Sequence, residues 1–198
     1  MNSKRRIIGW AGITMVIALI AAAFVLANFS AMSSHMERNS TLSSMGSNPN
    51  NQALTPSKTG LLVPGESRLA RSLEKQLAGQ LNTQPKFGQI QAVGELLEPA
   101  GYPVLMAEIE PQQMLWTPIY ARANVKVTIF YDSNGDISLK PEDATKMKFI
   151  GAELTIQRSG EYTFTDVSWG VMSRPAYLDY LAREISKQIA ADLKAQNP

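Results

Sequence analysis

Apolar residues follow two patterns in this chain, a long uncharged run near the start and periodic positions from residue 66 onward. Four leucines from Leu69 to Leu81 recur every four residues, which predicts an amphipathic helix over residues 66–81. Aliphatic residues from Leu178 to Leu193 form a second stripe, and Ser173 and Pro175 suit the start of a helix. A second amphipathic helix is therefore expected at the C-terminus.

Between the two helices the apolar positions alternate or cluster in short runs, as they do in strands. The segments expected to be strands are residues 104–110, 114–120, 125–131, 150–156 and 161–168. Asn134-Gly135 is a strong signal for a tight turn and predicts a hairpin between Tyr131 and Ile137. Ser159-Gly160 predicts a second hairpin. Residues 66–198 should thus form one α+β domain, in which an antiparallel sheet is flanked by an N-terminal and a C-terminal amphipathic helix.

The uncharged run covers residues 7–27 and is long enough to cross a bilayer as a helix, which takes about 20 residues. We interpret residues 7–28 as a transmembrane signal-anchor helix. The alternative is a cleaved signal peptide, because Ala31-Met32-Ser33 offers small residues at the spacing of a cleavage site. An uncleaved anchor is preferred, since the run exceeds the apolar core of roughly 7 to 15 residues in a typical signal peptide.

The charges around this run predict its orientation. Lys4, Arg5 and Arg6 precede it, whereas the first charged residue after it is Glu37, so residues 1–6 should be a cytoplasmic tail and the remainder extracytoplasmic. Three of the 19 basic side chains lie in that tail, which leaves 16 against 17 acidic ones, a net charge of −1. An exported part that is nearly neutral does not favour a nucleic-acid partner.

Residues 29–65 are rich in Ser, Asn, Met, Thr and Gly, show no sustained period and carry little charge. This composition predicts a disordered tether between the membrane and the domain.

Residues 132–143 resemble a calcium-binding loop in composition, with oxygen ligands at Asp132, Asn134, Asp136 and Asp143. The position that needs glycine in such a loop holds Ile137, and a strand rather than a helix precedes it. We therefore interpret the stretch as a hairpin turn and keep these four residues only as a weak cation-site candidate.

Catalytic side chains are scarce. The chain has no Cys and one His, His35, which lies in the predicted tether, so a Ser or Cys nucleophile activated by His is not expected. Ser72 and Lys75 match a Ser-x-x-Lys string on the predicted helix, and Glu108 and Glu110 share one face of a predicted strand. Both pairs are more simply interpreted as surface groups, and no cofactor or metal is expected.

Four residues are candidates for a binding surface: Trp116, Trp169, Arg174 and Tyr177. Amphipathic aromatic side chains favour interfaces, but core packing is the simpler interpretation of the two tryptophans. Packing at the helix start and a place on the surface are the simpler interpretation of Arg174 and Tyr177. We interpret the protein as a single-pass cell-membrane protein whose exported domain binds an envelope protein partner, or itself, in a non-enzymatic assembly role. The alternative is an extracytoplasmic carrier or sensor for a lipid or glycan.

Overall fold

The computed structural model describes residues 13–21, 30–43, 56–94, 100–133, 135, 137–138, 148–149 and 156–195. The elements, with their bounds, are β1 (Ser30–Ser43), β2 (Lys58–Leu62), α2 (Arg68–Leu81), the 3₁₀ turn η1 (Pro85–Phe87), β3 (Gln89–Ala92), β4 (Val104–Trp116), β5 (Tyr120–Asp132), β6 (Ile137–Ser138), β7 (Lys148–Phe149), β8 (Ile156–Met172) and α3 (Arg174–Ala195).

One six-stranded sheet, in the order β1-β8-β5-β4-β2-β3, forms the body of the domain. The predicted α+β class is confirmed, but the sheet is mixed rather than antiparallel. β1, β8, β5 and β4 pair antiparallel, whereas β2 runs parallel to both β3 and β4. Helix α2 makes the crossover from β2 to β3, and parallel neighbours require a connection of this kind.

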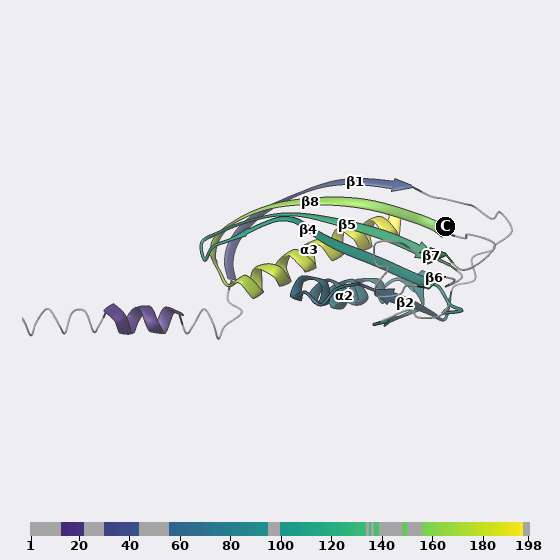
Figure 1. Ribbon diagram of the computed structural model, residues 1–198, viewed down its shortest axis with the longest axis horizontal. Helices are drawn as coiled ribbons and strands as arrows, with labels where there is room; N and C mark the ends of the chain where they lie inside the picture. Colours follow the sequence, from purple (N-terminus) through teal and green to yellow (C-terminus); the bar gives the residue numbers. More distant parts are fainter. Residues whose placement is uncertain are drawn as a thin grey trace, which may run out of the picture.

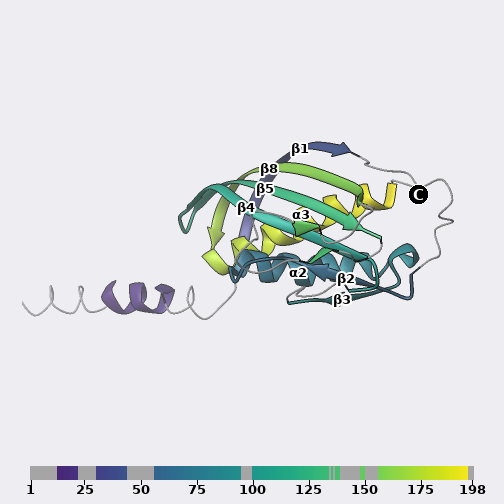
Figure 2. The same cartoon turned by 45° about the vertical axis from the view of Figure 1, so that its right-hand side comes forward.

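The sheet arches over α2 and α3, which both lie against its concave face (Figures 1 and 2). On β5, Ala121, Val125 and Ile129 point to the helices and are at most 3% exposed. The leucine stripe of α2 is at most 2% exposed, so the predicted helix is confirmed. Burial of apolar side chains on this face holds the two layers together.

The caps of both helices agree with the sequence. Ser67 Oγ accepts a hydrogen bond of 3.1 Å from the backbone N–H of Ala70 at the start of α2. Ser173 Oγ accepts one of 3.3 Å from Ala176 N, as its predicted place at the start of α3 requires. Each cap satisfies a backbone donor that the first turn would leave free.

The predicted tether is wrong where the structure describes it, because residues 29–65 contribute β1 and β2 to the sheet. All 14 residues of β1 pair with β8. Met32 and Met36 pack against the core, and Arg38 forms an ion pair of 2.8 Å with Asp192 of α3. The polar composition of this segment does not reveal the strand, because its stability comes from partners far along the chain in β8, the core and α3. Residues 44–55 lie outside the described residues.

Both predicted hairpins are absent from the sheet. Tyr131 pairs with Leu105 and Arg158, whereas Ile137 pairs with Phe149 in a separate two-stranded sheet. Ser159-Gly160 lies within β8, which continues through it because β1 and β5 flank it there on both sides. Residues 150–155 of the other predicted arm lie outside the described residues.

The predicted strand 104–110 and the first three residues of the predicted strand 114–120 belong to the single strand β4. This strand continues to Trp116 with a register shift between Pro111 and Gln113. Proline is tolerated at Pro111 because β2 pairs with β4 only up to Met106, so beyond that point β4 is the margin of the sheet.

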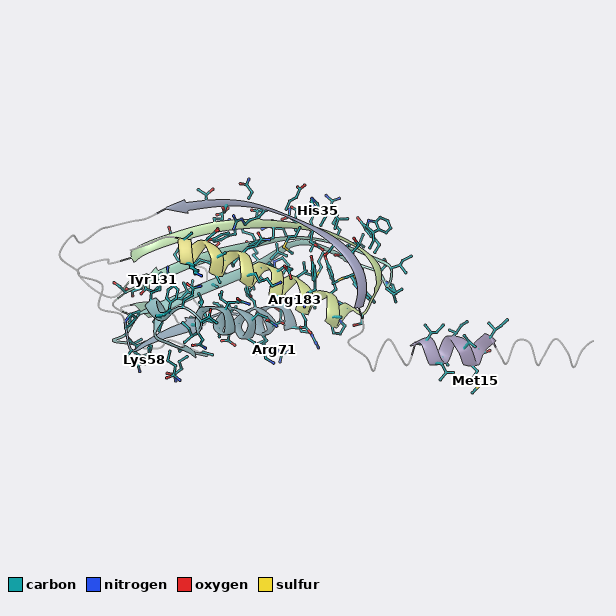
Figure 3. All side chains as sticks on the ribbon, turned by 180° about the vertical axis from the view of Figure 1, so that it is seen from behind. Met15, His35, Lys58, Arg71, Tyr131 and Arg183 are labelled. Atoms are coloured by element: carbon teal, nitrogen blue, oxygen red, sulfur yellow. The ribbon has the colours of Figure 1, made fainter. Side chains whose placement is uncertain are left out.

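Residues 13–21, inside the predicted span 7–28, are helical with exposed side chains, as Figure 3 illustrates for Met15. Within the described part of the chain, no helix combines the length and the apolar character needed to cross a membrane. The predicted cytoplasmic tail and the remainder of the span lie outside the described residues.

Gly135 provides a test of this fold. Its φ is +70°, its carbonyl accepts a hydrogen bond of 2.7 Å from Ala100 N, and an added Cβ would lie 2.1 Å from the Tyr102 carbonyl oxygen. We expect Gly135→Ala to lower the free energy of unfolding by at least about 1–2 kcal/mol, because alanine disfavours this backbone conformation and clashes. Urea unfolding of the detergent-solubilised chain measures the change.

Gly79→Ala is the matched control. Gly79 lies within α2 and an added Cβ would meet nothing within 4 Å. This substitution should raise the free energy of unfolding by roughly 0.5–1 kcal/mol, because alanine loses less backbone entropy in a helix. Equal effects of the two substitutions would contradict the tight approach at Gly135.

Candidate binding surface at the hairpin end of the sheet

Four elements meet at one end of the domain, called here the hairpin end: the start of β1, the β4–β5 hairpin, the end of β8 and the start of α3 (Figure 1). Thr117 closes the hairpin, since its N–H donates to the Tyr120 carbonyl at 2.8 Å and its Oγ1 accepts from Tyr120 N at 2.9 Å. Gly170 N donates to the Ile119 carbonyl at 3.0 Å, which ties the hairpin to β8.

All four predicted binding residues lie at the hairpin end, but in different surroundings. Trp116 is partly buried and packs against the core on the helix side of the sheet, and Tyr177 is fully buried in α3. Trp169 is 60% exposed on the opposite, convex face, and Arg174 is exposed as the first residue of α3. Their role in binding stays a prediction.

Trp169 belongs to a group of large apolar side chains that the structure leaves exposed. We call this group the apolar tip, and it consists of Leu115 (54% exposed), Ile119 (64%), Trp169 (60%) and Val171 (40%). Trp169 lies opposite Tyr120 on β5, with the two ring centroids 4.5 Å apart. The tip therefore draws on β4, its hairpin and β8.

The irregularity in β4 explains why Leu115 is exposed. Before the register shift, Ile109 faces the helices; after it, Met114 and Trp116 do, and Leu115 is turned outward opposite Arg122. A bulge reverses which alternate residues face the core. Sequence reasoning missed Leu115 for this reason. It missed Ile119 because that residue, expected in a strand, lies in the turn between β4 and β5. Val171 could have been found from its place two residues after Trp169.

Beneath the tip, a buried carboxylate joins β8 to α3. Asp166 is 1% exposed, and its Oδ2 accepts hydrogen bonds of 2.8 Å from Ser168 Oγ and of 2.8 Å from Tyr177 Oη. Its Oδ1 accepts one of 3.4 Å from Tyr180 Oη. The sequence held a signal for this group, since Asp166 alternates in phase with the buried Tyr162 and Phe164.

The electrostatics of this cluster follow from its burial. Desolvation raises the pKa of Asp166, and the three hydroxyl donors oppose the rise. Burial first, and then the charge of Asp166, raises the pKa of Tyr177, and burial also raises the pKa of Tyr180. Both tyrosines therefore stay protonated as donors near neutral pH, and the cluster fastens the start of α3 to the sheet.

The other chemical candidates are placed among surface groups. Lys126 forms an ion pair of 2.8 Å with Glu161, and Glu161 first, then Glu110 and Glu108, raises the pKa of Lys126. Glu108 and Glu110 thus lie on the convex face near Lys126, which is partly exposed. On the helix side, Ser72 hydrogen-bonds to Asp179, which also pairs with Arg68.

Asp132 is the one cation-site candidate within the described residues, where it is 3% exposed, and Asn134, Asp136 and Asp143 lie outside them. Among the described residues, no group of three or more His, Cys, Asp or Glu side chains could hold a metal ion.

No protein-family model matches the sequence, and no curated protein resembles it in sequence. Among solved structures, this chain matches a single-substitution variant of the PelC dodecamer from Paraburkholderia phytofirmans, with a TM-score of 0.43 and 14% identity over 78% of this chain and 96% of that one. A minor lipoprotein from Acinetobacter baumannii gives a TM-score of 0.36 and 18% identity over 70% and 96%. Because these scores are below 0.5, the proposals below rest on the chain's own residues.

The hydrogen bond from Tyr177 to Asp166 can be tested by removing its donor. We expect Tyr177→Phe to lower the free energy of unfolding by about 1–3 kcal/mol, because it leaves a buried carboxylate with one donor fewer. Tyr162→Phe is the matched control, since the Tyr162 hydroxyl is buried with no partner among the described residues and its loss should cost little. Urea unfolding of both variants measures the difference, and equal costs would contradict the cluster.

The raised pKa of Asp166 predicts a pH dependence. The Asp166 carboxyl binds its proton more tightly in the folded chain than in the unfolded chain, where its pKa is near 3.8. The protonated group therefore stabilises the fold fully below pH 3.8, and this stabilisation is lost as pH rises through the raised pKa of the folded state. Relative to Asp166→Asn, the wild type should therefore lose stability with rising pH across this window.

Asp179→Asn is the control of opposite sign. The hydrogen bond from Arg68 lowers the pKa of Asp179 in the folded chain. The ionised Asp179 therefore stabilises the fold above pH 3.8, and this stabilisation is lost as pH falls through the lowered pKa. Urea unfolding of the wild type and both variants between pH 2 and 7, roughly the range over which carboxylates titrate, measures both trends. A pH-independent difference for Asp166→Asn would refute the assignment.

Proposed function

We propose that this chain is a non-enzymatic, single-pass cell-membrane protein whose exported domain binds a protein partner, or a second copy, through the free edge of β1. The observation that carries the proposal is the edge itself. β1 is the last strand of the sheet, and among the described residues only β8 pairs with it.

The edge of β1 lacks most of the features that keep sheet margins from pairing. Natural proteins protect edges with short strands, proline, bulges or charged side chains. β1 has 14 residues in unbroken register with β8 and contains no proline. Its two charged residues each have a side-chain partner within the domain, since Arg38 pairs with Asp192 of α3 at 2.8 Å and Glu37 Oε1 lies 3.4 Å from His35 Nε2. Such an edge suits the addition of an extended strand.

The membrane anchor and the cell-envelope location belong to the same proposal. Their support is the uncharged run of residues 7–27 and the three basic residues before it. With β1 starting at Ser30, the domain follows this run after a very short connection. A partner would therefore be engaged close to the membrane surface.

A lipid or glycan carrier would need space between the sheet and the helices. The described core fills this region with tightly buried side chains, among them Leu73, Val127 and Ile185, each 0% exposed. The geometry thus favours binding at the edge over a ligand inside the domain.

Photo-cross-linking of the full chain in its own membrane tests the edge. A photoreactive phenylalanine analogue at Asn39, which is exposed on β1, should give a discrete adduct with a partner or a second copy. The same analogue at Lys75, exposed on α2, is the matched control and should give none. Adding His35→Lys and Thr41→Lys should abolish the Asn39 adduct, because lysine side chains on an edge strand disfavour pairing with another strand.

The proposal fails if Asn39 gives no adduct, or if the lysine substitutions leave the adduct unchanged. Circular dichroism of the lysine variant must match the wild type. Ala191→Lys, at an exposed position of α3, controls for added charge and should not affect cross-linking.

A further inference from the structure

We propose that the apolar tip lies in the interfacial layer of a lipid bilayer, so that the domain contacts the membrane directly as well as through its anchor. The inference goes beyond partner binding at β1 and rests on the anchor in the proposed function. Three independent features support it: the chemistry of the tip, the point where the chain leaves the domain, and the charges around the tip.

The side chains of the tip are those that favour a membrane interface. Leu115, Ile119 and Val171 expose aliphatic groups at the extreme end of the sheet. Trp169 packs against Tyr120, and both residue types are enriched where the bilayer meets water. An exposed apolar cluster of this kind marks an interaction site on a protein surface.

The path of the chain places the tip near the predicted span. Ser30 pairs with Met172, and Ala31 pairs with Val171, so β1 begins directly beside the tip. The predicted span ends at residue 28, two residues before Ser30. Two residues reach at most about 7 Å even when fully extended, so an anchored chain must hold the tip at the membrane surface.

The charges around the tip complement phospholipid headgroups. Arg122 is exposed opposite Leu115 and Val167, and Arg174 is exposed two residues after Met172. No acidic residue occurs in residues 30–36, 111–122 or 167–174, the segments that build the hairpin end. Arginine side chains beside an apolar patch can bind lipid phosphates while the patch enters the interface.

The chain has no Cys, so single-cysteine variants can each carry one spin label in the full-length protein. Labels at Ile119→Cys and Val171→Cys report on the tip, Ile17→Cys reports on the anchor, and Lys75→Cys on α2 is the aqueous control. The variants are reconstituted in vesicles of phosphatidylcholine and phosphatidylglycerol. Power-saturation electron paramagnetic resonance then compares collisions with oxygen and with a water-soluble nickel chelate.

We expect the oxygen-to-nickel collision ratio at both tip labels to exceed that at Lys75 several-fold. Adding Leu115→Asp should lower the ratio at Val171, because a carboxylate disfavours the interface and is repelled by phosphatidylglycerol. Leu115 is exposed, so this change should leave the melting curve unaltered, which circular dichroism checks.

The labels test the membrane contact of the tip and the membrane anchor separately. A lipid signal at Ile17 with aqueous tip labels overturns the inference and leaves the anchor standing, whereas aqueous signals at both overturn both. A lipid signal at the tip alone supports the tip as a membrane contact and overturns the anchor. Tip labels shielded from both oxygen and nickel would mean that a protein covers the tip, which overturns the inference.

Discussion

The pairing of β8 with both β1 and β5 is the constraint on which the rest of the structure depends. This strand runs for 17 residues and contacts a neighbour on each side along most of its length. It brings the polar segment of residues 30–43 into the sheet, and it carries Trp169 to the hairpin. Without β8, neither the edge of β1 nor the apolar tip would exist.

Asp166 links β8 to α3 through hydrogen bonds, and these bonds offset the free-energy cost of burying its carboxylate. A buried carboxylate is unfavourable unless hydrogen bonds replace its water, and Ser168, Tyr177 and Tyr180 supply them. An apolar residue at Asp166 could bury as much surface but would not fix the position of α3 in the same way. The polar contacts therefore favour one placement of the helix at the hairpin end.

The sequence predicted the features that depend on neighbouring residues, such as helices and their caps. The strands that were missed depend on pairing between residues far apart in the chain. The leucine stripe of α2 and the Ser173 cap were predictable because helix periodicity and capping act over a few residues. The turn signal at Asn134-Gly135 misled, because Gly135 is needed for its approach to Tyr102 rather than for a hairpin. β1 was missed since its stability comes from residues far along the chain. In the candidate surface, Trp169 was predictable from its residue type, whereas Leu115 depends on a bulge.

The two proposed surfaces constrain each other through the direction of the strands. The apolar tip lies where β4 and β8 end and β5 begins, whereas the free edge of β1 runs along the side of the same sheet (Figure 1). If the tip lies at the bilayer, the strands extend away from the membrane, and the edge of β1 is accessible to neighbours on the same membrane. Anchored copies or partners on one membrane could then meet at this edge without lifting the tip. Confinement to that surface would raise their effective concentration, so that even a weak strand-to-strand contact could assemble them.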